Sequence, residues 1–125
     1  MKKIISISFV VSLLSACATN EPPIYHWGNY QQSMYENMKQ ENFDPVEHIA
    51  LLEKDKEKAA SLNRSVPPGF YGYLGMLYAE LGRDGDAVSA FNQEKTLFPE
   101  ATIFMDFLLN PNKSAVETSA VAAQE

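Results

Sequence analysis

Few side chains in this sequence are suited to catalysis or metal binding. Histidine is the side chain whose charge changes most readily near neutral pH, and the chain has two, His26 and His48. A zinc-protease helix carries two histidines four residues apart. Glu47-His48, with Glu53 further along, lacks this second histidine. Ordinary surface or half-buried roles are therefore favoured for both histidines over a metal site.

Two further patterns fail as active sites. Asp84-Gly85-Asp86 could begin a calcium loop, but such a loop needs glycine at its sixth position and a carboxylate at its twelfth. Ser89 and Lys95 stand there instead. The chain has no G-x-S-x-G, no phosphate-binding glycine loop and no second cysteine. The sequence therefore predicts a protein that is not an enzyme, with no metal, no catalytic residue and no small-molecule substrate.

The sole cysteine, Cys17, ends a segment with the features of a secretory signal. Lys2 and Lys3 give it a basic start, and an apolar stretch at 4–14 follows that is too short to span a bilayer stably. Leu14-Ser15-Ala16-Cys17 resembles the lipobox of bacterial lipoproteins. That resemblance implies cleavage after residue 16, a diacylglycerol on the Cys17 sulfur and an N-acyl chain such as palmitate. An ordinary exported protein with a stray thiol is the alternative.

The expected lipid anchor defines a location. Two or three acyl chains hold a protein on a membrane almost permanently. Ala18 and Thr19 replace the aspartate that is typical of inner-membrane retention, so we expect an outer-membrane lipoprotein that faces the periplasm. Cleavage would remove two lysines and change the formal charge from -6 to -8. This charge argues against nucleic acid as a partner and leaves the acyl chains as the membrane contact.

The chain divides into four predicted parts: a signal at 1–16, the lipidated cysteine and a tether at 17–24, a helical domain at 25–109 and a disordered tail at 110–125. Helices are expected at about 28–40, 45–62, after Pro68 to Gly82, from Asp84 or Asp86 onward, and from Pro99. Asp44 and Pro45 are typical of a helix start. The expected stripe of the first helix is Tyr30, Met34, Tyr35 and Met38, that of the second is Ile49, Leu52, Ala59 and Leu62, and the charged run 54–58 is expected in solvent.

A 34-residue unit from Pro68 to Ala101 matches seven of the eight signature positions of a tetratricopeptide repeat. Gly75 would let its two helices approach closely. Gly69 and Gly72 would lie near the concave groove, and with Met76 they are candidate partner contacts. The matching positions, which we expect to pack the repeat, are Tyr71, Leu74, Gly75, Tyr78, Ala87, Phe91 and Pro99.

One repeat cannot bury its own apolar face, so flanking helices must cover it. Trp27, Tyr30 and Met34 could imitate a degenerate preceding repeat, although the 44 residues from Trp27 to Tyr71 exceed a regular period. Trp27 and Tyr30 could instead form an aromatic partner site, with core packing favoured. A short apolar helix at 103–109 would cap the stack, unless part of it awaits a partner. The predicted fold class is all-α, with tetratricopeptide-like hairpins.

Glu94 stands where the repeat pattern has alanine. An unpaired buried carboxylate is costly. We expect it to cap the last helix toward Glu100-Ala101-Thr102, or else to contact a basic or amide group of a partner in the groove.

Four stretches together carry a wider resemblance: YHWGNY at 25–30, VPPGFYGYLG at 66–75, EKTLFPE at 94–100 and IFMDFLL at 103–109. They resemble a family of small bacterial lipoproteins classed only as a domain of unknown function. The resemblance implies a gene beside that of a lipoprotein similar to the curli secretion pore, and hence a shared envelope complex. The leading hypothesis is a non-catalytic adaptor with such a partner. The alternatives are an activator of a peptidoglycan synthase and a small hydrolase that uses His26 or His48.

Overall fold

The computed structural model describes residues 21–40 and 43–110, which form five α-helices and one 3₁₀ turn. The expected signal, Cys17 and nearly all of the expected tail lie outside the described residues. Within the described part no β-strand occurs, and one isolated bridge pairs Tyr25 with Ser65. The all-α fold class is confirmed. The elements are α2 (Tyr30–Lys39), α3 (Pro45–Ser61), α4 (Phe70–Glu80), α5 (Asp84–Leu97), η2 (Pro99–Ala101) and α6 (Thr102–Leu109).

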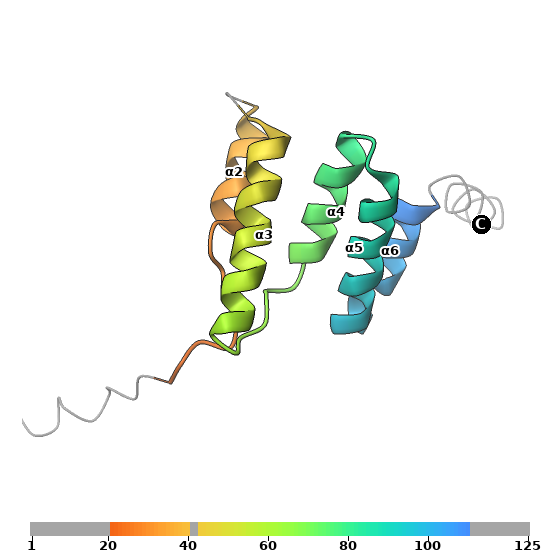
Figure 1. The fold of residues 1–125 in the computed structure, drawn as a ribbon. Coiled ribbons are helices and arrows are strands. Elements are labelled where there is room, and N and C mark those ends of the chain that lie inside the picture. Colours follow the sequence, from red (N-terminus) through yellow and green to blue (C-terminus); the bar gives the residue numbers. More distant parts are fainter. Residues whose placement is uncertain (1–20, 41–42, 111–125) are drawn as a thin grey trace, which may run out of the picture.

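The helices alternate in direction and form two layers (Figure 1). Helices α2 and α3 make the first hairpin, in which His48 of α3 contacts Glu36 of α2. Helices α4 and α5 make the second hairpin, and α6 packs on α5. Helices α2, α4 and α6 share one layer, while α3 and α5 share the other. This arrangement is compatible with tetratricopeptide-like hairpins. In the part of the chain that the structure describes, no helix is both long and apolar enough to cross a membrane.

Helix α3 begins where the sequence predicts. The side chain of Asp44 accepts a hydrogen bond from the backbone N–H of Val46 at 2.9 Å, and Pro45 occupies the first turn. Most of the predicted inner face is buried, but Leu62 is 44% exposed. That expectation was wrong because the helix ends at residue 61 and Leu62 is already its C-cap.

The close packing of α4 against α5 confirms the role of Gly75. A Cβ atom at this position would lie 2.6 Å from Cε1 of the Phe91 ring, far inside van der Waals contact. Leu74, Tyr78 and Phe91 are buried, as the repeat pattern predicts, whereas Tyr71 is half-buried. The other two signature positions also fit, since Ala87 is buried and Pro99 begins η2.

Helix α2 is turned away from its expected orientation. It begins at Tyr30, so Trp27 lies before the helix and does not occupy a signature position within it. Tyr30 and Ser33 are buried, whereas Tyr35 and Met38 are 54% and 72% exposed. The reason is polar: the Ser33 hydroxyl lies 3.1 Å from the Tyr73 hydroxyl, which also donates to the Ser33 carbonyl at 3.0 Å.

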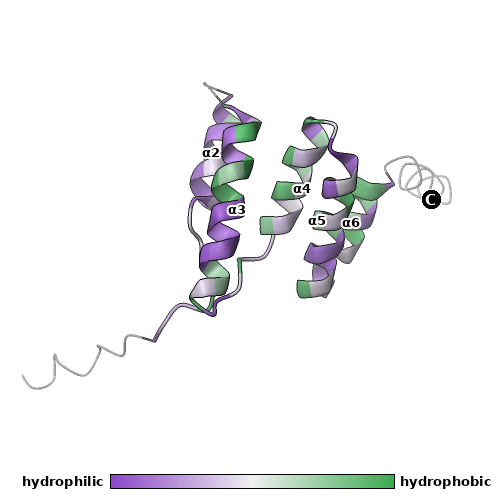
Figure 2. Cartoon of the chain, in the orientation of Figure 1, coloured by the Kyte–Doolittle hydropathy of each residue, from purple (hydrophilic) through white to green (hydrophobic). Residues whose placement is uncertain are grey.

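Helix α6 is covered on one side only. Met105 is buried at 3% exposure, whereas Ile103 is 86%, Phe104 54% and Phe107 45% exposed. Figure 2 shows α6 as largely hydrophobic, in contrast to the hydrophilic stretches of α3. Of the two sequence-based expectations for this helix, the described contacts support an apolar face without a cover.

A Gly75→Ala variant should lower the free energy of unfolding by about 1–3 kcal/mol, because the new methyl group forces a rigid aromatic ring to move. Urea denaturation measures the change. Gly85→Ala in α5 is the matched control, since a Cβ there meets nothing within 4 Å. Equal stability of the two variants would contradict the close approach.

Candidate functional site

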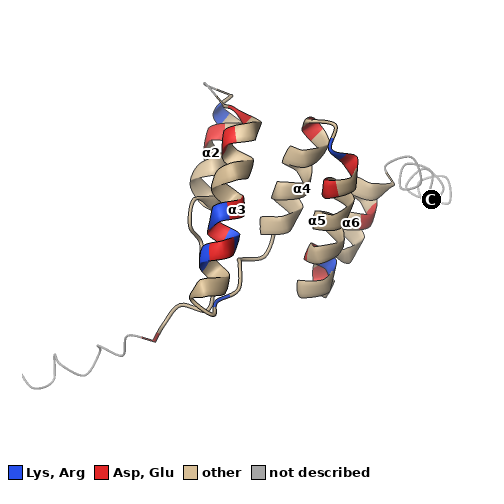
Figure 3. Ribbon diagram, in the orientation of Figure 1, with Lys and Arg blue, Asp and Glu red and all other residues tan. Residues whose placement is uncertain are grey.

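An apolar groove runs along α4 and is walled by α2 on one side and α6 on the other. Its larger part has a volume of about 390 Å³ and its smaller part about 330 Å³, and both parts share Met34, Tyr73 and Met76. Figure 3 shows that the body of α4 carries no charge, since Glu80 at its end is its only charged residue. We call this surface the methionine groove. The residues that define it are Met34, Met38, Tyr73, Met76, Phe104 and Met105.

Methionine is concentrated in this groove. The chain has five methionines, and the four within the described residues all line it: Met34, Met38, Met76 and Met105. Met38 and Met76 are 72% and 41% exposed, whereas Met105 is buried. Because methionine is unbranched and polarizable, a surface made of it adapts to differently shaped apolar partners.

The structure brings together most of the residues that sequence reasoning proposed for partner binding. Tyr30, Gly69, Gly72, Met76 and Glu94 all line the larger part of the methionine groove. Gly72 is not an open floor as expected, because a Cβ there would lie 3.1 Å from the Met105 methyl carbon. Trp27 does not line the groove. It is 44% exposed and stacks on the Tyr30 ring at a centroid distance of 6.3 Å.

Glu94 is fully buried beneath the groove at 0% exposure. Its carboxylate accepts hydrogen bonds from the backbone N–H groups of Gly69, Tyr71 and Gly72 at 2.6, 3.0 and 3.2 Å. It therefore caps the amino end of α4, not the last helix toward Glu100-Ala101-Thr102, and that expectation was wrong. The burial also leaves no exposed carboxylate for a partner. The first turn of a helix offers both unpaired N–H groups and a favourable dipole to an anion.

Tyr30 lies over this capped end. Burial raises the pKa of its hydroxyl, and the nearby charge of Glu94 and the Tyr73 side chain raise it further. The groove wall formed by Tyr30 is therefore neutral at physiological pH. Gly69 must be glycine here, because its φ is +88° and a Cβ would lie 2.7 Å from the Tyr30 hydroxyl oxygen.

One known protein family matches the part of the chain that contains the described helices, apart from the last residue of α6. A family described as a domain of unknown function (DUF4810) matches residues 24–108. The chain belongs to the DUF4810 family. The expected resemblance to a domain of unknown function is thereby confirmed. No curated protein and no solved structure matches the chain.

A second buried carboxylate in this DUF4810 chain repeats the device of Glu94. Asp55 of α3 accepts the backbone N–H of Asn29 at 2.6 Å and two contacts from its side-chain amide at 3.1 and 3.2 Å. It lies at 7% exposure, so its expected place in solvent was wrong. A Gly-x-Tyr sequence occurs at both capped helix ends, beginning at Gly28 and at Gly69. This repeated sequence is the feature from which the two capped ends could have been predicted.

The two histidines of the DUF4810 chain each contact one carboxylate. His26 Nε2 lies 3.8 Å from Asp55 Oδ1, and His48 Nε2 lies 3.3 Å from Glu36 Oε2. The His48 ring also stacks on Phe43 at a centroid distance of 4.5 Å. Among the described residues, no group of three or more His, Cys, Asp or Glu side chains could hold a metal ion. These contacts fit a structural role for both rings.

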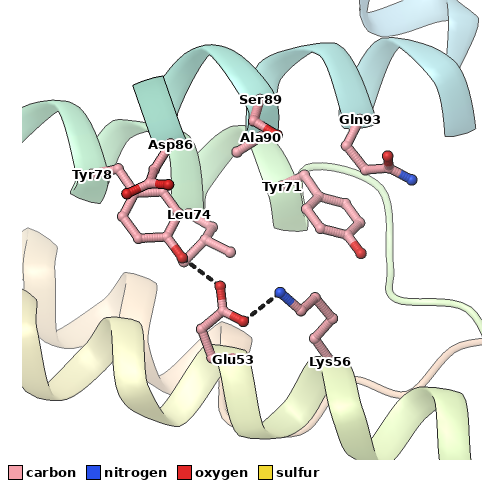
Figure 4. A pocket seen from close by; sticks show the side chains of 9 residues that line it. All are labelled: Glu53, Lys56, Tyr71, Leu74, Tyr78, Asp86, Ser89, Ala90 and Gln93. Carbon is pink, nitrogen blue, oxygen red and sulfur yellow. Dashed lines mark hydrogen bonds and ion pairs between the residues drawn. The ribbon is translucent and has the colours of Figure 1, made fainter. Parts of the chain in front are cut away.

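A polar cleft of about 440 Å³ separates α3 from the α4–α5 hairpin of the DUF4810 domain (Figure 4). Glu53 points into it, accepts a hydrogen bond from the Tyr78 hydroxyl and pairs with Lys56. Burial raises the pKa of Tyr78, and the hydrogen bond to Glu53 raises it further. Burial alone would raise the pKa of Glu53, but the bonds from Lys56 and Tyr78 outweigh it and lower that pKa. The polar contact between Glu53 and Tyr78 in this cleft therefore links the first hairpin to the second.

Replacing Glu94 with glutamine should lower the free energy of unfolding by about 2 kcal/mol, because the amide NH₂ would face a buried N–H group that then lacks an acceptor. Urea denaturation measures this loss, with the exposed Glu57→Gln on α3 as the matched control. If both variants were as stable as the parent chain, the carboxylate would not be needed at this helix end.

The raised pKa of Tyr78 predicts a loss of stability at alkaline pH. A tyrosine whose pKa is higher in the folded chain than its usual 10.0 contributes stability that is present below pH 10 and lost above it. The stability advantage of the parent chain over Tyr78→Phe should therefore shrink as pH rises above about 10. Urea denaturation between pH 8 and 11 measures it, and a constant difference would contradict the assignment.

Proposed function

We propose that this chain is a non-catalytic adaptor of the bacterial outer membrane, anchored by lipid on Cys17 and facing the periplasm. In this proposal it supports the assembly or stability of an envelope complex by docking a protein partner. The observation that carries the proposal is the methionine groove, an exposed apolar surface on a small helical domain. Exposed apolar patches rimmed by polar residues typically mark interaction sites.

The shape of the groove supports docking over simple imperfect packing. Three helices form its floor and its two walls, and its centre at Met76 stays 41% exposed. Phe104 extends the apolar surface onto α6 at 54% exposure. Burying such side chains in an interface is worth about 25 cal/mol per Å² of apolar surface before the costs of association.

The anchor is supported by the sequence Leu14-Ser15-Ala16-Cys17, which lies outside the described residues. The seven-residue tether at 18–24 reaches at most about 23 Å. Beyond it, the backbone N–H of His26 donates to the Ser65 carbonyl at 2.8 Å, which fixes the incoming chain to the domain. Tyr30 of the groove follows four residues later. The groove would therefore work close to the membrane surface.

The sequence resembles lipoproteins that are encoded beside a curli-pore-like lipoprotein, and we propose a protein of this curli-pore-like class as the partner. A photo-crosslinking amino acid at Met38, the exposed edge of the groove, tests it in the full-length chain in intact cells. We expect a discrete crosslink to an envelope protein.

Met76→Glu should reduce that crosslink at least about tenfold, because a carboxylate at the groove centre would be buried by the partner. Val88→Glu is the matched control, since Val88 on α5 is similarly exposed at 45% and lies outside the groove. Cys17→Ser should also abolish the crosslink if the anchor places the groove. Equal crosslinking by all variants would contradict the proposal.

A further inference from the structure

We infer that the methionine groove takes an amphipathic helix of a partner protein, about three turns long, with a basic side chain at each end. This inference rests on the proposed function of the groove as a docking site and names the chemistry of what docks. It follows from the walls of the groove, its length and the charges at its two ends.

The walls favour a helix over an extended peptide. An added strand needs free backbone N–H and C=O groups along an edge, whereas the floor of the groove is the helix α4 and its walls are the helices α2 and α6. The N–H groups of Gly69, Tyr71 and Gly72 are already bonded to Glu94. An occupant must therefore satisfy its own backbone, and a helix does so internally.

The length of the occupant follows from α4, which forms the floor. This helix has 11 residues, from Phe70 to Glu80, and thus spans about 17 Å at 1.5 Å per residue. A helix lying along it contributes about 11 residues, or three turns. Apolar side chains at positions i+3, i+4 and i+7 of such a helix would face the groove.

The two ends of the groove carry unpaired carboxylates. Glu100 belongs to the part that Pro68 and Gly69 line, near the start of α4, whereas Glu80 ends α4 and lies with Asn37 and Met38. Both glutamates are exposed, and neither forms an ion pair with another described residue. No described lysine or arginine lines the groove. Basic residues at i and i+11, which share one helix face, would meet both charges.

Charge and composition argue against two other occupants. A second copy of the chain carries the same net negative charge, formally -6 for the full sequence and -8 after the expected cleavage, so the copies repel each other. The chain's own residues 111–125 contain only Val116 and Val121 as larger apolar side chains, too few to fill even the larger part of the groove, of about 390 Å³. Each of these occupants has a distinct outcome in the test.

The test uses the full chain in nanodiscs of neutral lipid and a fluorescent 14-residue probe peptide. The peptide is alanine-based and stapled on its outer face, with leucine at positions 4, 5 and 8 and lysine at positions 1 and 12. A second probe carries glutamate at positions 1 and 12. Fluorescence anisotropy at low salt should show the lysine probe binding about tenfold more tightly than the glutamate probe, from two exposed ion pairs against two repulsions.

The Glu80→Lys/Glu100→Lys double variant should reverse this preference, and Met76→Glu should weaken both probes. Glu57→Lys/Glu47→Lys, an exposed charge swap on α3, is the matched control and should leave the preference unchanged. Equal affinity of the two probes, a preference that the double variant does not reverse, or no binding of either probe at 100 μM would overturn the inference. So would a stable dimer that excludes the probe, or tight probe binding only after residues 111–125 are deleted.

Failure of this inference is separable from failure of the proposed function. A cellular crosslink from Met38 to a segment that is not a basic-ended apolar helix would leave the adaptor standing and remove the inference. Probe binding with the expected charge preference, but no envelope crosslink in cells, would do the reverse.

Discussion

The described structure depends on one buried carboxylate. Glu94 sits in α5, yet three backbone N–H groups at the start of α4 point at its oxygens. A charge removed from water is tolerated only where such donors replace its hydration. These bonds fix the start of α4 against the last turn of α5, while Gly75 lets the two helices meet at the Phe91 ring. The floor of the methionine groove is thereby set, because Gly69 and Gly72 belong to the capped turn.

The first hairpin is built by the same rule. Asp55 of α3 holds the start of α2 as Glu94 of α5 holds the start of α4, and each capped turn follows a glycine with positive φ, at Gly28 and Gly69. Tyr30 therefore corresponds to Tyr71, at a spacing of 41 residues, and Trp27 does not. Two polar contacts then join the hairpins, Ser33 to Tyr73 and Glu53 to Tyr78. These contacts orient one apolar unit on the other, which hydrophobic burial alone would not do.

The sequence predicts the local contacts of this fold, but not the buried carboxylates whose partners are distant in the chain. Gly75 and Asp44 were predictable because their roles are local: a helix contact at fixed spacing and a cap two residues from its donor. Asp55 was placed in solvent because its neighbours in the sequence are charged, and nothing local reveals an acceptor needed 26 residues away. Glu94 was recognised as an anomaly in the repeat, but its donors lie 22 to 25 residues earlier in the chain. Apolar periodicity likewise could not foresee that Ser33 faces inward and Met38 outward.

The same construction explains why an apolar surface is left over. In a stack of hairpins each first helix is covered by its own second helix and by the next unit, whereas α6 follows the second hairpin with no described helix beyond it. Met105 reaches back onto Gly72 and closes the floor of the groove, but Phe104 and Ile103 remain outside. Extending the floor with methionine in place of branched side chains keeps this surface deformable at little packing cost. One surface therefore combines an uncovered helix face, an adaptable floor and acidic ends, and the proposed partner helix would match all three.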